Sequence, residues 1–231
     1  MPSRFERTGD GAVRRLRFVP EDRRGLLTEA ALASLVESLG ALPAETRLVV
    51  LEGARDDLFA AGADLEAIAQ LTPEAALAFA DQGRAAIAAW ESVEATTVAV
   101  VRGACFGGAL DLVQASDLIV AFPAATFAHP GVKRGIVTGW GGTVRLARRL
   151  SPAALHRLFL EGEPVPALHA YANGLVDILV ESDAALEPLL AAWAGEAGES
   201  LRALKRIARE TEGLTLARAL VVEERLRELG D

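Results

Sequence analysis

Residues 101–146, together with the apolar run that leads into them, constrain the fold of this chain more than any other stretch. An apolar run at 97–101 is typical of a buried strand, and Gly107 and Gly108 then open a predicted helix that carries Asp111. The first amides of a helix have no intrahelical partner, and glycines let a ligand approach the backbone closely. The pattern predicts a place where developing negative charge is held, with an acid one turn away. The alternative is a glycine pair that only turns a strand into a helix.

Strands and helices alternate through the rest of the chain. Apolar runs predict further strands, and apolar residues at helical spacing, several after a capping Thr or Ser, predict helices. The predicted strands are 14–19, 47–52 and 175–180, and the predicted helices are 28–39, 65–68, 72–90, 151–160, 166–173, 184–194, 199–209 and 214–229. Interleaved strands and helices indicate the α/β class, and no repeat or linker divides the chain.

Composition excludes several classes of function. The 231 residues carry a formal net charge of −8, and 51% of them are hydrophobic. A sizeable core can therefore be buried, while nucleic acid and anionic membranes are poor partners for so acidic a chain. Cys105 is the single cysteine, which excludes an intrachain disulfide and a multi-cysteine metal site. Because no apolar signal region or membrane-length run is found, we expect a cytoplasmic protein. We also expect no bound metal.

Common catalytic signatures are absent from the sequence. It contains no G-x-S-x-G elbow, no Walker A loop and no H-E-x-x-H motif. The run Gly139-Trp-Gly-Gly-Thr is superficially similar to a dinucleotide-binding loop, but its third glycine is misplaced. Of the three histidines, His156 and His169 fall in predicted helices, where surface or core roles are expected.

Several sequence blocks stand in a characteristic order. They are Phe59-Ala-Ala-Gly-Ala-Asp-Leu, Arg102-Gly-Ala-Cys-Phe-Gly-Gly-Ala-Leu-Asp-Leu, Ser116-Asp-Leu-Ile-Val-Ala, Ala125-Thr-Phe-Ala-His-Pro, Gly135-Ile-Val-Thr-Gly-Trp-Gly-Gly-Thr-Val-Arg-Leu and Gly174-Leu-Val. In this order and spacing they resemble the crotonase (enoyl-CoA hydratase/isomerase) family, over roughly residues 14–206. The resemblance implies a spiral of β-β-α turns over residues 1–180. It also implies a C-terminal helical region over 181–231, shortened relative to the family, that assembles trimers or hexamers.

The resemblance also implies a chemistry. Family members bind acyl-CoA thioesters and stabilise an enolate at the thioester carbonyl, so coenzyme A belongs to the substrate and no prosthetic group is expected. Two backbone N–H groups form the oxyanion hole, and by motif match these belong to Ala63 and Gly108. The neighbouring residues that the resemblance assigns to substrate binding are Ala61, Gly62, Asp64 and Gly107.

The proton-transferring groups of the family are only partly present. Family hydratases use two glutamates to place and protonate a water. The first position falls on Asp111, whose side chain is shorter, and the second falls on Gly131. Loss of a general acid removes a factor of roughly 10² to 10⁴ in rate. His129, two residues upstream, is the first candidate to replace it, with Lys133 and Arg134 as weaker candidates. The alternative for His129 is a packing role at the end of a strand.

The coenzyme side of the site also departs from the family pattern. Glu66 stands where a lysine is common, and Arg23 and Arg24 occupy an early loop where a basic residue often lies near the nucleotide. The alternative for both arginines is a solvated turn. The sequence ends at Asp231, before the family's final segment, which leads us to expect a more open site, a different partner arrangement or weak coenzyme A binding. Trp140 takes a position where a small residue is common, and it either narrows the acyl pocket or packs under its loop.

Two classes of function remain open. The first is an acyl-CoA enzyme that uses the oxyanion hole with a single carboxylate, Asp111, for double-bond isomerisation, or with a replacement acid for hydration. The second is a catalytically inactive assembly subunit or binding protein that keeps the fold. Retention of Gly108 and Asp111 favours the enzyme, whereas Gly131 and Glu66 favour the second class. The expected partners are an acyl-CoA substrate and further copies of the chain.

Overall fold

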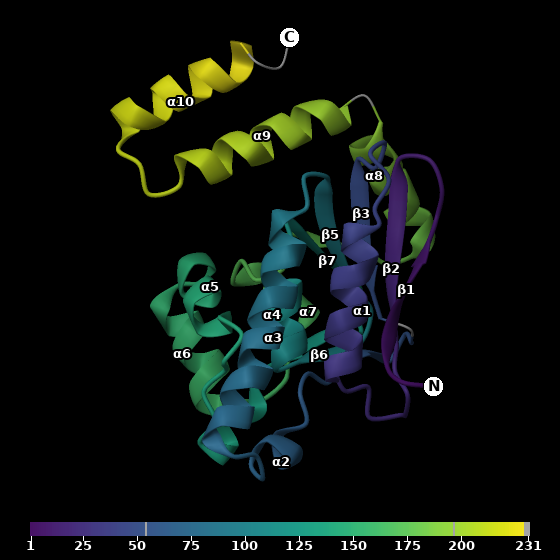
Figure 1. Ribbon diagram of the computed structural model, residues 1–231, viewed down its shortest axis with the longest axis vertical. Helices are drawn as coiled ribbons and strands as arrows, with labels where there is room; N and C mark the ends of the chain where they lie inside the picture. The colour runs from purple at the N-terminus through teal and green to yellow at the C-terminus, as the bar shows by residue number, and fades with distance from the viewer. Residues whose placement is uncertain (54, 196, 229–231) are drawn as a thin grey trace.

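Two β-sheets form the framework of the protein (Figure 1), whose computed structural model describes residues 1–53, 55–195 and 197–228. The larger sheet has the strand order β1-β2-β3-β5-β7-β10. Its β1–β2 pair is antiparallel, and the four pairs from β2 to β10 are parallel. The strands of this sheet are β1 (Arg4–Thr8), β2 (Val13–Val19), β3 (Leu48–Glu52), β5 (Thr96–Val101), β7 (Leu118–Ala121) and β10 (Ile178–Leu179).

The smaller sheet has the order β4-β6-β8-β9. The first three of its strands pair in parallel, and β9 runs antiparallel to β8. They are β4 (Leu58–Ala60), β6 (Ala104–Phe106), β8 (Thr126–Ala128) and β9 (Val165–Pro166).

Helical segments join successive passes through the two sheets. The helices are α1 (Glu29–Gly40), α2 (Leu65–Ile68), α3 (Pro73–Ser92), α4 (Gly108–Val113), α5 (Gly142–Arg149), α6 (Pro152–Glu161), α7 (Ala167–Ala172), α8 (Asp183–Ala194), α9 (Ala197–Thr211) and α10 (Leu216–Glu228), and Pro130–Arg134 forms the 3-10 helix η1. Thr28, Thr72 and Ser151 each accept a hydrogen bond from the amide three residues later, which confirms three predicted helix starts.

The chain visits the sheets in a repeating order. β3 of the larger sheet is followed by β4 of the smaller sheet and then by α2 and α3, and the β5, β6, α4 segment repeats this order. β7 and β8 open a third turn that continues through η1 and α5. The predicted α/β spiral of β-β-α turns is therefore confirmed.

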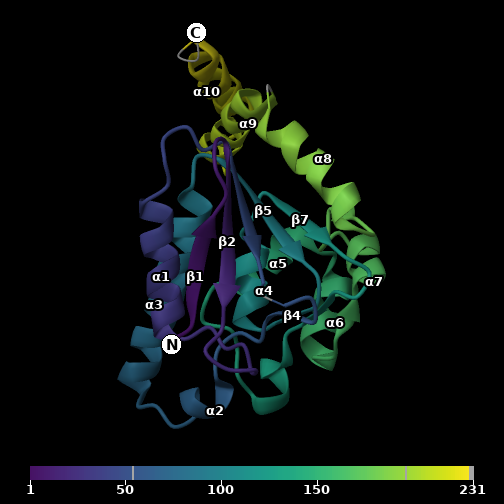
Figure 2. The same ribbon diagram turned by 90° about the vertical axis from the view of Figure 1, so that its right-hand side faces the viewer.

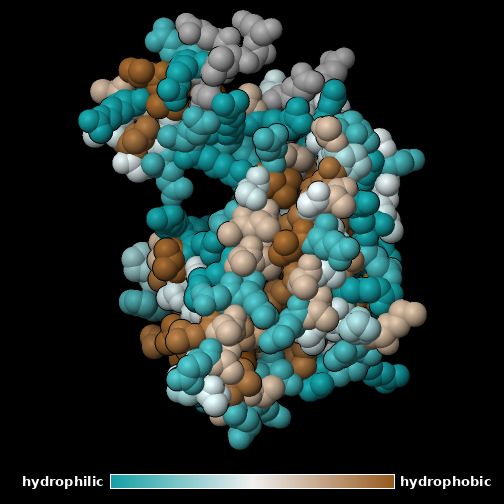
Figure 3. Space-filling view, in the orientation of Figure 1, coloured by the Kyte–Doolittle hydropathy of each residue, from teal (hydrophilic) through white to brown (hydrophobic). Residues whose placement is uncertain are grey.

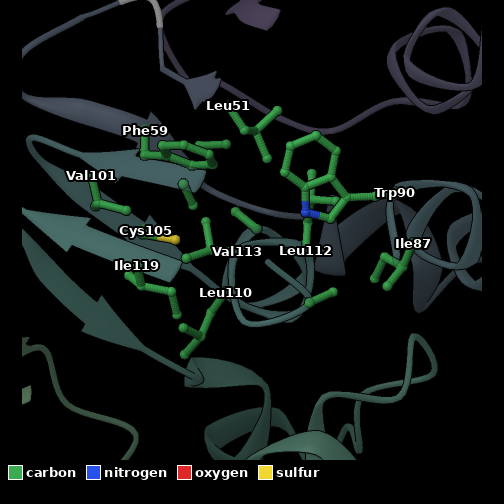
Figure 4. Close-up of a cluster of buried hydrophobic side chains, with 14 of the residues drawn as sticks. Leu51, Phe59, Ile87, Trp90, Val101, Cys105, Leu110, Leu112, Val113 and Ile119 are labelled. Atoms are coloured by element: carbon green, nitrogen blue, oxygen red, sulfur yellow. The ribbon is translucent and has the colours of Figure 1, made fainter. Parts of the chain in front are cut away.

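Helices cover both faces of the larger sheet. Figure 2 shows α1 and α3 on one side of this sheet and α8 on the other. The main hydrophobic core lies on the α1 and α3 side, and α4 is deeply embedded in it, with residues 109–113 all buried. Figure 4 shows the α4 side chains beside Cys105 of β6 and Trp90 of α3. Because α4 follows directly from Gly107, this packing fixes the backbone at that turn.

An arm made of α9 and α10 extends beyond the sheets (Figure 1). α9 contacts α8 and β5, whereas the contacts of α10 are mainly with α9. In contrast, α8 buries Leu186, Leu190 and Ala194 against the larger sheet. Of the helices in the predicted region 181–231, α8 therefore belongs to the core, and α9 and α10 form the arm. Residues 196 and 229–231 of that region lie outside the described residues.

Several strands were not predicted from the sequence. β4, β6 and β8 have three residues each, too few to display a periodicity, and parallel partners far along the chain hold them in place. β1 is polar on its outer face and was also missed, although it pairs along its full length with β2. The late strand predicted at 175–180 is shorter, with only residues 178–179 in β10.

A buried lysine anchors the arm to the core. Nζ of Lys205 in α9 donates to the Asp117 carboxylate and, at 2.9 Å, to the carbonyl of Ala95. The Lys205 side chain is 8% exposed. Burial lowers the pKa of Lys205, and the neighbouring Asp117 carboxylate opposes that decrease. The Lys205 ammonium group is therefore held by hydrogen bonds to protein atoms, with little access for water.

The two lysines of the chain provide a matched test of this anchor. Lys205→Met should lower the free energy of unfolding by about 1–3 kcal/mol, because Ala95 and Asp117 lose a charged donor. Lys133→Met should cost at most about 1 kcal/mol, since the Lys133–Glu163 pair is exposed. Urea denaturation measures both, and equal losses for the two variants would contradict the anchoring role.

Candidate active site

Three neighbouring strands of the smaller sheet end at one edge. Because β4, β6 and β8 are parallel, with Ala60 opposite Cys105 and Phe106 opposite Ala128, their carboxyl ends lie side by side. The loops after the three strands begin at Ala61, Gly107 and His129. Ligands of parallel sheets commonly bind at this edge, because the loops there converge. All three of these residues line one pocket.

Two backbone amides at this edge are left without backbone partners. The Gly107 amide donates to the Ala128 carbonyl at 2.9 Å and so continues the pairing of β6 with β8. The next amide, that of Gly108, begins α4 and has no acceptor within the helix. Among the backbone hydrogen bonds of the described residues, none is donated by the amide of Gly108 or of Ala63. Both residues line the pocket, so two free donors belong to the same wall.

Gly62 allows the two amide-bearing loops to touch. Its φ is +80°, which L side chains rarely adopt, and a Cβ at this position would lie 2.6 Å from the Phe106 carbonyl oxygen. The same Cβ would lie 2.7 Å from the Gly108 nitrogen. A side chain would therefore force the Ala63 and Gly108 loops apart.

The pocket beside these loops is small and apolar. Its volume is about 210 Å³. The lining comes from the three loops, from α2 and α3, and from the segment before α5. The lining residues are Ala61, Ala63, Leu65, Ile68, Ala76, Phe79, Ala80, Gly107, Gly108, His129, Pro130, Gly131, Ile136, Val137, Thr138, Gly139 and Trp140. Among these described residues His129 carries the one ionisable side chain, so the pocket suits an uncharged group.

A buried polar pair, Asp111 and His129, lies at one wall of the pocket. His129 Nε2 lies 3.0 Å from Asp111 Oδ1, and the Thr138 hydroxyl donates to Asp111 Oδ2. Asp111 is 0% exposed and does not line the pocket, whereas His129 is 5% exposed and does. Asp111, the carboxylate expected from the sequence to transfer protons, therefore contacts the pocket only through His129 and Thr138.

Backbone and aromatic contacts fix this pair. A Cβ at Gly142 would lie 1.7 Å from Asp111 Oδ1, so the first residue of α5 packs directly on the carboxylate. The His129 ring lies against Phe159 of α6, with ring centroids 5.0 Å apart. Asp111 and His129 are thus held by α4, α5 and α6 together.

Comparison with known proteins identifies the family of this fold and site. A family model described as enoyl-CoA hydratase/isomerase matches residues 20–228. The chain belongs to the crotonase family. The carnitinyl-CoA dehydratase of Citrobacter koseri is 33% identical over 171 residues, which cover 72% of this chain and 65% of that protein. The chain thus spans about two thirds of that relative's length.

Further relatives agree with this family. The 2,3-dehydroadipyl-CoA hydratase of Escherichia coli is 31% identical over 209 residues, which cover 88% of this chain and 80% of that protein. A crystal structure of enoyl-CoA hydratase from Thermoplasma volcanium superimposes with a TM-score of 0.90 at 24% identity, covering 97% of this chain and 91% of that one. The latter likeness shows a shared fold.

This crotonase-family chain lacks a carboxylate at the second expected position. Gly131 lies in the first turn of η1, is buried and lines the pocket. The two basic residues that follow it are engaged in ion pairs, Lys133 with Glu163 and Arg134 with Glu66. His129 is therefore the one predicted proton-transfer candidate of this segment that lies in the pocket wall.

Cys105 is close to the polar pair but is not a nucleophile. Its side chain is fully buried in the core. Burial raises the pKa of the Cys105 thiol well above its ordinary value, and the charge of Asp111 raises it further. The thiol therefore stays protonated at neutral pH.

The predicted coenzyme-binding residues lie beside the Ala63 turn. The loop of Arg23 and Arg24 is joined to this turn by the Ala61 amide, which donates to the Gly25 carbonyl at 2.8 Å. Arg24 forms ion pairs with Asp22 and Asp64. Asp64 also caps α2, and it does not line the pocket.

Trp140 occupies space that two glycines leave open. A Cβ at Gly83 would lie 2.1 Å from Cε2 of its indole, and a Cβ at Gly108 would lie 2.3 Å from Cζ3. Phe79 also packs against the indole, with ring centroids 5.6 Å apart. Trp140 is 4% exposed and lines the pocket, so it both narrows the pocket and packs under its loop.

The sequence did not indicate several residues of the site. Thr138 was quoted only within a family block, yet its hydroxyl binds Asp111. Phe79 and Gly83 belong to an alanine-rich helix whose pattern gave no sign of a pocket. The run of glycines around Trp140 was a visible signal, since Gly142 makes room for Asp111.

The described residues contain neither a candidate metal cluster nor a helix of membrane length. Among them, no three His, Cys, Asp or Glu side chains gather in a way that could hold a metal ion. In the same residues, no helix is both long and apolar enough to cross a bilayer. A larger hollow of about 420 Å³ lies between α9 and the ends of α1 and α3, and none of its lining residues was predicted for the site.

Proposed function

We propose that this protein is an enzyme that processes acyl-CoA thioesters by stabilising an enolate. The observation that carries the proposal is the pair of unpartnered amides, Ala63 and Gly108, in the wall of one apolar pocket that also contains His129. An enolate places negative charge on the former thioester oxygen. Preorganised backbone donors stabilise such charge strongly, because they need no reorganisation during the reaction.

The reaction type follows from the number of proton-transferring groups. The Asp111–His129 pair is one such unit, and Gly131 provides no second carboxylate. Moving a double bond requires one group that removes a proton from one carbon and returns it to another. Hydration or dehydration, the reactions in the names of the relatives, also requires a placed water. We therefore favour enoyl-CoA isomerase-type chemistry with Asp111 as its carboxylate, and hydratase-type chemistry is second.

The pocket also bears on the substrate. Its apolar lining and small volume suit a short, uncharged acyl group. The loop of Arg23 and Arg24 lies beside the Ala63 turn and provides positive charge for the phosphates of coenzyme A. Since Arg24 is already paired with Asp64, we assign the stronger contribution to Arg23.

A panel of acyl-CoA thioesters tests the proposal. Short enoyl thioesters should raise the melting temperature of the protein and be turned over, whereas free coenzyme A should give a smaller shift. Turnover is measured as a change in the absorbance of the conjugated enoyl thioester. Binding without turnover across the panel would contradict the enzyme and favour the alternative, a crotonase-fold binding protein or assembly subunit.

Trp140 predicts a limit on acyl length. Trp140→Ala should open the pocket toward Gly83, so that kcat/KM for longer acyl chains rises at least about tenfold relative to the shortest chain. The profile of kcat/KM against acyl length measures this change. Trp193→Ala, on α8 away from the pocket, is the matched control, and an unchanged profile in Trp140→Ala would contradict the assignment.

We also propose that copies of the chain assemble into trimers or hexamers. The arm exposes several large apolar side chains, and Figure 3 shows hydrophobic surface over α10. They are Leu204, Leu214, Leu216, Leu220 and Val221. Closed oligomers commonly cover such surfaces. Light scattering should give a mass of three or six chains, and a stable monomer at micromolar concentration would contradict this.

A further inference from the structure

We infer that His129 is the catalytic proton carrier and that Asp111 is its positioning residue, rather than the group that meets the substrate. This inference rests on the proposed enolate chemistry and assigns the roles within it. The geometry that supports it is the order of the two residues, with His129 in the pocket wall and Asp111 fully buried and outside that wall.

Asp111 has no free path to a substrate. Its Oδ1 faces His129 Nε2 at 3.0 Å, and its Oδ2 accepts the Thr138 hydroxyl. Gly142 packs directly on Oδ1 from a third direction. A carboxylate enclosed in this way can hold and stabilise a neighbouring group, but it cannot reach a carbon atom in the pocket.

The contact with Asp111 selects the form of His129 that can act as a base. An ionised carboxylate only accepts hydrogen bonds, so His129 must carry its proton on Nε2. In the neutral ring the other nitrogen, Nδ1, then has a free lone pair. Within the described residues Nδ1 has no hydrogen-bond partner, and it is not among the buried unpartnered side-chain atoms. This nitrogen therefore has some exposed surface, and we infer that it faces the pocket that His129 lines.

Titratable groups of neighbouring elements lie around the Asp111–His129 pair. Arg145 of α5 and Cys105 of β6 both feel the Asp111 charge, and Arg145 is itself paired with Glu91. On η1, the charged groups of Lys133 and Arg134 are paired with Glu163 and Glu66. From α6, His129 meets the uncharged ring of Phe159. Asp111 is thus the charged group in direct contact with His129.

The proposed step needs no further reactant. The Nδ1 lone pair takes a proton from a carbon activated by the thioester carbonyl, the C–H electrons form the enolate C=C bond, and the π electrons of the carbonyl move onto its oxygen. The resulting enolate oxygen accepts hydrogen bonds from the amides of Ala63 and Gly108, while Asp111 stabilises the imidazolium. Return of the proton to the same carbon gives hydrogen exchange. Return to the conjugated carbon gives a shifted double bond.

Exchange of substrate hydrogen with deuterated water tests the assignment most directly. Wild-type protein should catalyse exchange of hydrogen into a short acyl-CoA. His129→Gln should lower the rate at least about 100-fold with little change in the Kd of the thioester. His156→Gln makes the same substitution on the exposed face of α6, and it should leave the rate unchanged.

Asp111→Asn tests the positioning role. With the Thr138 hydroxyl donating to the asparagine oxygen, the amide nitrogen would face His129 Nε2 and force the ring proton onto Nδ1. The exchange rate should fall at least about tenfold and KM should change little, because Asp111 does not line the pocket. Nitrogen-15 spectra resolve the rings of the three histidines. The His129 ring should be protonated on Nε2 in the wild type and on Nδ1 in the variant.

The outcomes separate this inference from the proposed function. Exchange that persists in His129→Gln would overturn the role of His129 and leave the enolate chemistry intact. Exchange lost in His129→Gln but unchanged in both rate and tautomer in Asp111→Asn would overturn the positioning role. If the wild type exchanges no thioester of the panel, the proposed function fails and the catalytic role of His129 fails with it.

Discussion

Parallel pairing of β4, β6 and β8 is the constraint on which the site depends. Each strand has only three residues, yet their register brings the Ala63 turn, the Gly108 amide and His129 to one edge. A slip of one residue along β6 would point the neighbouring side chains to the opposite face and would move the start of α4. The larger sheet and the main core hold these short strands, because α4 is buried immediately after the turn that carries Gly108.

The sequence predicted long elements well and short ones poorly. Thr28, Thr72 and Ser151 marked helix starts that the structure confirms, and the apolar runs at 47–52 and 97–101 became central strands. The family blocks predicted the spiral, which local patterns alone could not give. The Asp111–His129 contact could not be predicted, because it joins two elements across 18 residues and depends on how α5 packs against α4.

The environment of that pair gives it an effect that a surface pair would lack. Because Asp111 is fully buried, water screens its charge weakly, so its interaction with a protonated His129 is stronger than in solution. The same charge would be costly if it were unpartnered, and His129 and Thr138 together satisfy both carboxylate oxygens. The polar pair is therefore compatible with the core only as a complete hydrogen-bonded unit.

Trp140 and the two glycines that it touches restrict the order in which this pocket could have changed. With tryptophan present, a Cβ at residue 83 or 108 would overlap the indole, so Gly83 and Gly108 cannot be replaced first. Replacing Trp140 first removes that conflict. If residue 83 or 108 then gained a side chain, a return to tryptophan would be blocked until the glycine was restored. A single substitution of Trp140 therefore widens the pocket. If a glycine has changed afterwards, narrowing the pocket again requires the glycine to be restored before the tryptophan.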